Sequence, residues 1–138
     1  MKRVLILMAL TACTSSPNYA RPYTPIQATH KHSRPSAVQK AVIALTDAGR
    51  EIESSDAATG IVLSKWFEGD GALAGNYRYR IRVVLDETSG YAIEALCQAK
   101  NPEAFSGGGW IDCPKIDGQD LRPQFVLDLL ARVNAALM

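Results

Sequence analysis

The stretch YRYRIRVVL, residues 77–85, decides the fold because its side chains alternate in character. Successive side chains of a strand point to opposite faces of a sheet, so the residues at odd positions predict one buried face. Arg78, Arg80 and Arg82 fall on the other face. The stretch therefore predicts a strand of an antiparallel sheet, with a basic stripe that points away from the core.

A return strand follows this stretch directly. The sequence DETSG at 86–90 is typical of a hairpin turn, and apolar residues alternate from 91 to 97. If the turn is centred on Thr88, Arg82 lies opposite Glu94, and a cross-strand ion pair there would contribute about 0.2–1 kcal/mol. Similar but shorter patterns predict strands at 50–54, 61–67 and 110–113.

A helix is predicted on either side of these strands. Ser36 and Gln39 fit a capping box at the start of the first helix, and Gly49 can end it in the left-handed conformation. The last helix is predicted to begin between Asp120 and Pro123. Each helix has an apolar face, formed by Val38, Ala41, Val42, Leu45 and Ala48 in the first and by Val126, Leu129, Leu130, Val133 and Leu137 in the last. Both faces can be buried together only on one side of the sheet. We therefore expect an α+β two-layer sandwich, with an antiparallel sheet of about four strands and the N- and C-terminal helices on one face.

The composition is that of one ordinary globular domain, with 47% hydrophobic and 21% charged residues in a chain of 138. Fifteen Lys and Arg residues balance fourteen Asp and Glu residues, so the net charge is too small to attract nucleic acid to the protein as a whole. No apolar run reaches the about 20 residues that a membrane-spanning helix needs.

The chain begins with a cationic segment, Met1-Lys2-Arg3, and an apolar run at 4–10, at the short end of the about 7–15 residues of a signal-peptide core. Leu10-Thr11-Ala12-Cys13 then resembles the processing box of bacterial lipoproteins. That resemblance implies a signal peptide at 1–12, lipidation of Cys13 with palmitate-type chains and, because Thr14 is not Asp, sorting to the outer membrane. The alternatives are a secretory signal that is cut later, or a buried N-terminal strand with a core cysteine.

Residues 13–35 contain several prolines among polar residues, which predicts a lipidated Cys and a flexible tether in front of a single α+β domain at 36–138. His30 and His32 in this segment could form a metal-binding pair or a pH-sensitive spot. Two histidines without a carboxylate or cysteine in a fixed frame are more typical of solvated polar residues, so we expect no metal and no cofactor.

Cys97 and Cys113 form an even pair once Cys13 is lipidated, and the envelope permits disulfides. A bridge between them would close a glycine-rich loop and contribute about 3 kcal/mol. The alternative is two reduced core cysteines. A catalytic thiol is disfavoured because the sequence has no Cys-x-x-Cys motif and its histidines lie in the predicted tether.

The segment AVIALTDAGREIESSDAATGIVLSKW, residues 41–66, places an amphipathic helix and a short strand before a turn at 56–60. Its Asp56-Ala57-Ala58-Thr59-Gly60-Ile61-Val62 portion resembles the BamC (NlpB) family of small envelope lipoproteins. The resemblance implies helices packed on one face of an antiparallel sheet, in a single such domain rather than two. Locally, Asp56 can bond amides two residues on and Gly60 can adopt an unusual backbone conformation, which favours a structural turn over a binding loop.

Two groups of residues are candidates for binding. Arg78, Arg80 and Arg82 could bind lipid phosphates, lipopolysaccharide or peptidoglycan carboxylates, or they could form a solvated face with Glu94 as a partner. Trp66, Phe67 and Trp110 could line a groove for a peptide or glycan, or pack at the core. No nucleophile and base in the sequence form a recognisable catalytic frame.

These observations together favour an outer-membrane-anchored periplasmic lipoprotein that is a non-catalytic accessory or binding subunit of a cell-envelope complex. Its expected partners are the membrane, through the lipid anchor, and an envelope protein, with no nucleic acid and no small-molecule substrate. The alternative is a small envelope enzyme or enzyme inhibitor that uses a groove near Trp66 and Trp110.

Overall fold

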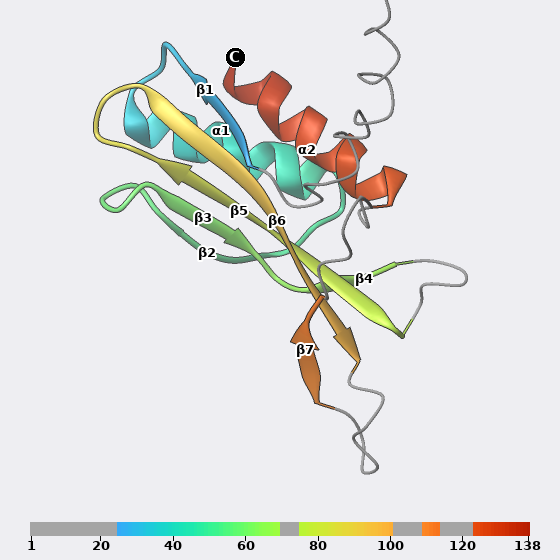
Figure 1. Cartoon of the computed structure of the whole chain (residues 1–138). Coiled ribbons are helices and arrows are strands. Elements are labelled where there is room, and N and C mark those ends of the chain that lie inside the picture. The colour runs from blue at the N-terminus through green and yellow to red at the C-terminus, as the bar shows by residue number, and fades with distance from the viewer. Residues whose placement is uncertain (1–24, 70–74, 101–108, 114–122) are drawn as a thin grey trace, which may run out of the picture.

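A computed structural model describes residues 25–69, 75–100, 109–113 and 123–138. It has an α+β architecture in which two helices cover one face of a seven-stranded antiparallel sheet (Figure 1). The predicted fold class is confirmed, but the expected number of about four strands was wrong. The elements are β1 (Ile26–Thr29), α1 (Arg34–Asp47), β2 (Ile52–Asp56), β3 (Ile61–Ser64), β4 (Phe67–Glu68), β5 (Tyr77–Leu85), β6 (Gly90–Lys100), β7 (Trp110–Asp112) and α2 (Gln124–Leu137).

The sheet is built around the hairpin of β5 and β6. Its strand order is β1-β6-β5-β3-β2, with β4 also paired to β5 and β7 also paired to β6. Arg82 pairs with Glu94 in the register that the sequence predicts. The far ends of β5 and β6, together with β4 and β7, extend beyond the helices (Figure 1).

The turn between β5 and β6 is held by one carboxylate. The Oδ1 atom of Asp86 accepts hydrogen bonds from two backbone N–H groups, that of Thr88 at 2.8 Å and that of Gly90 at 2.9 Å. It also accepts one from the Thr88 hydroxyl at 2.9 Å. These bonds, led by the one from the Thr88 side chain, hold the pKa of Asp86 below its usual value. The same contacts fix the register of the hairpin.

The core lies between the helices and the sheet. All five apolar residues expected on the last helix are buried, as are the odd-numbered residues of β5 from Tyr79 to Leu85. The hydroxyl of Tyr91 on β6 donates a hydrogen bond to Asn134 Oδ1 on α2 at 2.6 Å, which ties the sheet to the helix layer. Burial raises the pKa of Tyr91.

The folded domain begins earlier than the sequence predicts. β1 pairs with β6, so the part of the expected tether at 26–35 is strand, turn and helix start. The helix begins at Arg34 rather than near Ser36, because Ser33 is its N-cap and accepts a hydrogen bond from the Ser36 N–H at 3.3 Å. Pro35 is compatible with this start, since proline is tolerated in the first turn of a helix.

The 56–60 segment is a structural turn. Asp56 Oδ1 accepts a hydrogen bond from the Ala58 N–H at 2.8 Å, and its carbonyl accepts one from the Gly60 N–H at 2.8 Å. Gly60 has a positive φ of 75° and is buried, and its carbonyl accepts a hydrogen bond from the Leu85 N–H at 2.7 Å. Gly60 thus connects the turn to the end of β5.

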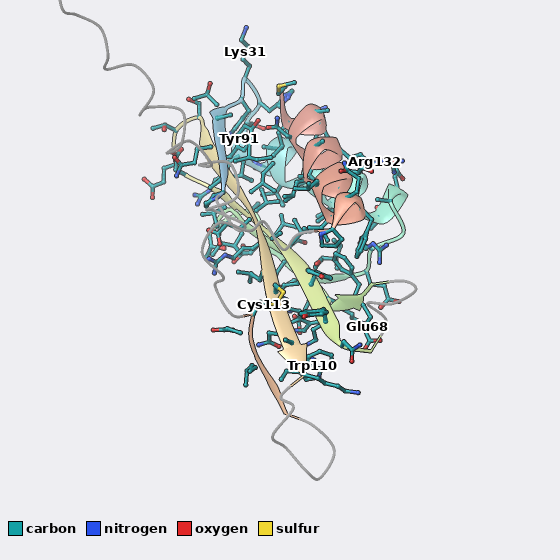
Figure 2. All side chains as sticks on the ribbon, turned by 45° about the vertical axis from the view of Figure 1, so that its right-hand side comes forward. Lys31, Glu68, Tyr91, Trp110, Cys113 and Arg132 are labelled. Carbon is teal, nitrogen blue, oxygen red and sulfur yellow. A yellow bond between two sulfur atoms is a disulfide. The ribbon has the colours of Figure 1, made fainter. Side chains whose placement is uncertain are left out.

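Cys97 and Cys113 form a disulfide with a Cα–Cα distance of 5.5 Å. Cys113 directly follows β7, and its N–H donates to the Cys97 carbonyl at 3.2 Å. The bridge therefore fixes β7 to the adjacent strand β6. Figure 2 shows Cys113 and Trp110 near the end of the molecule that lies away from Tyr91 and Arg132.

Candidate functional site

The face of the sheet opposite the helices carries the arginine stripe. Arg78, Arg80 and Arg82 are half-buried on this face, whereas the residues between them on β5 point into the core. None of the described helices packs against it (Figure 1). We call it the open face.

An interruption in the predicted 61–67 strand turns Trp66 onto the open face. The buried Ser64 ends β3, where its hydroxyl accepts a hydrogen bond from the Ile81 N–H at 2.9 Å and donates one to the Lys65 carbonyl at 3.0 Å. β4 then starts at Phe67, opposite the buried Tyr79. Ser64 and Phe67 both face the helices, although residues three positions apart in a regular strand would face opposite sides of the sheet. Trp66, the residue before Phe67, therefore lies on the open face. An uninterrupted strand would have pointed it into the core.

Trp110 reaches the same face from the other side of the hairpin. It is the first residue of β7, where it pairs with Lys100 of β6, and Asp112 pairs with Gln98. Paired residues share a face of the sheet, and Gln98 pairs in turn with Arg78. Trp110 therefore lies beside the arginine stripe, on a strand that the disulfide holds in place.

The two tryptophans and two of the arginines stack against each other. The Cζ atom of Arg78 lies 4.7 Å from the ring centroid of Trp66 and 4.5 Å from that of Trp110. The Cζ atom of Arg80 lies 4.7 Å from the Trp66 centroid. Each such contact contributes about 0.5–2 kcal/mol, depending on how far it is removed from water.

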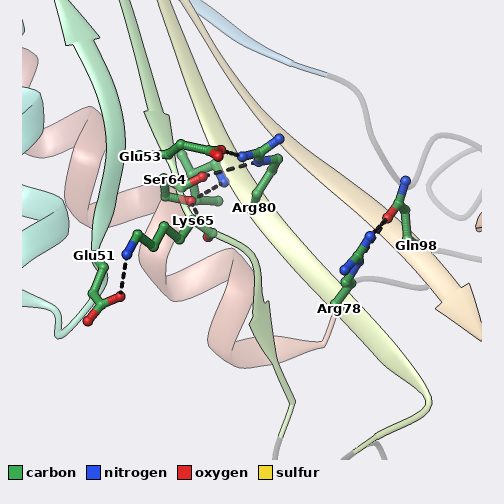
Figure 3. A network of polar contacts seen from close by, with 8 residues as sticks. Glu51, Glu53, Ser64, Lys65, Arg78, Arg80 and Gln98 are labelled. Atoms are coloured by element: carbon green, nitrogen blue, oxygen red, sulfur yellow. Dashed lines mark hydrogen bonds and ion pairs between the residues drawn. The ribbon is translucent and has the colours of Figure 1, made fainter. Parts of the chain in front are cut away.

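Polar groups fix the arginines in this arrangement (Figure 3). Gln98 Oε1 accepts hydrogen bonds from Nε and Nη2 of Arg78 at 2.8 and 2.5 Å. Arg80 forms an ion pair with Glu53, and its Nε donates to the Ser64 carbonyl at 3.1 Å. Only 15% of the Arg80 side chain is exposed, and burial lowers its pKa. We call Trp66, Arg78, Arg80, Gln98 and Trp110 the Trp–Arg cluster.

Arg82 does not belong to this cluster. Its Nη2 lies 2.6 Å from Glu94 Oε2, and the two side chains are 42% and 21% exposed. The stripe and the groove, which the sequence treats as separate candidates, therefore meet at Arg78 and Arg80 but not at Arg82. Phe67, the third aromatic candidate, lies on the helix side, in contact with Tyr79 and Phe125.

A shallow depression borders the cluster at Trp66. It has a volume of about 230 Å³ and is lined by Arg50, Glu51, Lys65, Trp66 and other neighbours. Its Lys65–Glu51 ion pair spans 3.3 Å between side chains that are 58% and 76% exposed, so water screens the pair. A depression of about 330 Å³ lies elsewhere, beside β1 and the hairpin turn. The Trp66 side of the cluster is thus an open surface rather than a deep cleft.

His30 is not the solvated residue that the sequence predicts. It is 4% exposed, packs against Tyr91, and its Nδ1 accepts a hydrogen bond from the His32 N–H at 3.1 Å. In the described part of the chain, no group of three or more His, Cys, Asp or Glu residues gathers in a geometry that could hold a metal. No described helix is long and apolar enough to cross a membrane. Cys13 lies outside the described residues.

Comparisons of the sequence with protein-family models and with curated proteins find no match.

Proposed function

We propose that this protein is a lipoprotein, anchored at the outer membrane and facing the periplasm, that is a non-catalytic accessory or binding subunit of a cell-envelope complex. The observation that carries the proposal is the Leu10-Thr11-Ala12-Cys13 box behind a cationic start and an apolar run. In a bacterial lipoprotein, cleavage before this cysteine and its acylation leave several acyl chains on the new N-terminus. At about 0.8 kcal/mol per buried methylene, such an anchor is stable.

The disulfide supports the same location. Structural disulfides persist in oxidising compartments such as the periplasm and are rare in the cytosol. Cys97 lies on β6 and Cys113 directly follows β7, and their Cα–Cα distance of 5.5 Å is ordinary for a disulfide.

The open face supports a binding role. Trp and Arg are the residue types most enriched among the energetically important residues of protein interfaces. In this chain two of each are gathered on one face of the sheet, and no described helix covers them. A surface of this composition favours an envelope protein as the partner over nucleic acid or a small-molecule substrate.

The second candidate function is a small envelope enzyme or enzyme inhibitor that uses the groove near Trp66 and Trp110. The depression beside Trp66 favours it, because it contains the carboxylate of Glu51 and the amine of Lys65 next to an aromatic side chain. The ion pair is exposed, and enzymatic groups gain their reactivity from partial burial. The open surface therefore supports the binding role better.

The lipid anchor is tested by intact mass and membrane fractionation. The full chain is expressed in a bacterium with two membranes, and the expected product lacks residues 1–12, carries acyl chains on Cys13 and fractionates with the outer membrane. Cys13→Ser should keep its leader and gain no acyl mass. Thr14→Asp should be lipidated normally but remain in the inner membrane. An unmodified Cys13 with the leader still attached would overturn the proposal.

A further inference from the structure

We propose that the Trp–Arg cluster is the docking surface for a protein segment that presents a carboxylate beside an apolar side chain. This inference rests on the proposed binding role and names the chemistry of the partner. Within the cluster, Arg78 is the residue that we expect to contact the carboxylate.

Arg78 differs from the other two arginines of the stripe in what neutralises it. Arg80 is paired with Glu53, and Arg82 is paired with Glu94. Arg78 is instead bonded to the neutral amide oxygen of Gln98, and Glu68, its register partner on β4, is exposed and forms no ion pair with it. No carboxylate of the described residues forms an ion pair with Arg78.

The guanidinium of Arg78 is also held in place before any partner binds. Two indole rings lie within 4.7 Å of its Cζ atom, and two of its nitrogens are used by one oxygen atom. Arginine forks match carboxylates because their donors are planar and fixed. A preorganised fork loses less conformational entropy on binding than a free side chain does.

Apolar side chains follow this fork along the open face, from Leu96 diagonally across from Arg78 to Leu63 and Ile61 opposite Arg82 and Val84. Leu96 pairs with Arg80 and Leu63 pairs with Arg82, so both leucines share the face of the arginines, where they are half-buried. Ile61 at the edge of this face is 38% exposed. Such a mixture of aliphatic, aromatic and Arg residues is typical of the centre of a protein interface. A partner that supplied only a charge would leave these side chains uncovered.

The charges on the open face argue against a polyanionic ligand such as lipopolysaccharide. Among the described residues, the carboxylates on this face outnumber the cations: Glu53, Asp56, Glu68, Glu94 and Asp112 lie with Arg78, Arg80, Arg82 and Lys100. Recognition of an anionic polymer depends on an extended uncompensated field. Among the described arginines of the stripe, Arg78 alone has no bonded carboxylate, which suits a single carboxylate better.

Peptide display tests the inference directly. The protein, as its expression host produces it, is purified in detergent and used to select from a library of random 12-residue displayed peptides. We expect the selected peptides to contain Asp or Glu next to an aliphatic or aromatic residue. Changing that acid to its amide should weaken binding at least tenfold.

Two variants assign the binding to Arg78. Arg78→Gln should weaken the selected peptides at least tenfold. Gln98→Glu should do the same, because it supplies a carboxylate from within the chain, as Glu94 does for Arg82, while leaving the stack intact. Arg82→Gln is the matched control and should change binding less than twofold. Urea denaturation of each variant checks that it is folded, and Gln98→Glu is expected to be at least as stable as the parent.

Three outcomes would overturn the inference. The first is that no peptide is enriched. The second is that the selected peptides do not depend on the proposed contact, either because they lack acids or because their affinity for the Gln98→Glu variant equals their affinity for the parent. The third is that the protein binds phosphatidylglycerol vesicles or lipopolysaccharide, and that this binding survives each single Arg→Gln change but is lost when Arg78, Arg80 and Arg82 are all replaced by Gln. The display result does not depend on Cys13, so it can fail while lipidation is found, and lipidation can fail while the peptides bind.

Discussion

Gly60 offers a quantitative test of how the turn at 56–60 is joined to the end of β5. We predict that Gly60→Ala destabilises the protein strongly, whereas Gly49→Ala does so mildly. Both glycines have a positive φ, 75° at Gly60 and 83° at Gly49, so both alanines carry the same backbone strain of about 1–2 kcal/mol. The two sites differ only in their surroundings.

A Cβ atom at Gly49 would have nothing within 4 Å. At Gly60 it would overlap the Leu85 carbonyl oxygen and lie 2.6 Å from Arg34 Nε. That backbone oxygen cannot move freely, because Leu85 ends β5 and its N–H is bonded to the Gly60 carbonyl at 2.7 Å. Overpacking of this kind costs about 1–3 kcal/mol, which brings the expected total for Gly60→Ala to about 2–5 kcal/mol.

Urea denaturation followed by tryptophan fluorescence, with the disulfide intact, measures both free energies of unfolding. The difference between the variants should be about 1–3 kcal/mol, and each kcal/mol should lower the melting temperature by about 3–6 °C for a chain of 138 residues. Equal destabilisation by the two alanines would refute the contact between Gly60 and the Leu85 carbonyl, and with it the described connection of the turn to β5.

Three further measurements probe the hairpin and the disulfide. Replacing Cys97 and Cys113 together by Ser should lower the free energy of unfolding by about 3 kcal/mol, and titration of the denatured, unreduced parent should find neither thiol free. Glu94→Gln should cost no more than about 1 kcal/mol, because its partner Arg82 is partly exposed and water screens the pair; a larger loss would show that the open face is more buried than described. Asp86 has a lowered pKa in the folded state, so its contribution to stability is present above about pH 4, the ordinary pKa of Asp, and is lost as the pH falls through the lower folded value. In the Asp86→Asn variant, the free energy of unfolding should therefore fall less steeply as the pH is lowered. An unchanged pH dependence below about pH 4 would contradict the turn geometry.

Patterns with a strict period could be predicted from the sequence. The pairing of Arg82 with Glu94 followed from the two-residue period of the strands and the position of the turn, and α2 buries the apolar face that its spacing indicates. β1 was missed although Ile26, Ala28 and His30 also alternate with polar residues, because the prolines around them indicated a tether. Four residues are too few for periodicity to outweigh that composition.

The candidate site was harder to predict, because it depends on two local events that break a pattern. The hydroxyl of Ser64 takes the place of a strand partner for the Ile81 N–H, and this ends β3 and reverses the side on which Trp66 lies. Trp110 enters the site through the pairing of β7 with β6 across a long connection. The two cysteines were the one sequence signal for that pairing. The sequence therefore supplied the tryptophans and arginines of the cluster, but not Gln98, and it did not show that they meet.

We expect the open face to depend on the redox state of the protein, because β7 is short. Three residue pairs connect this strand to β6, and the disulfide directly after it adds a covalent link to the same strand. If Cys97 and Cys113 are reduced, we expect Trp110 to be held less firmly against Arg78. Formation of the disulfide would therefore complete the surface that we propose for acidic segments.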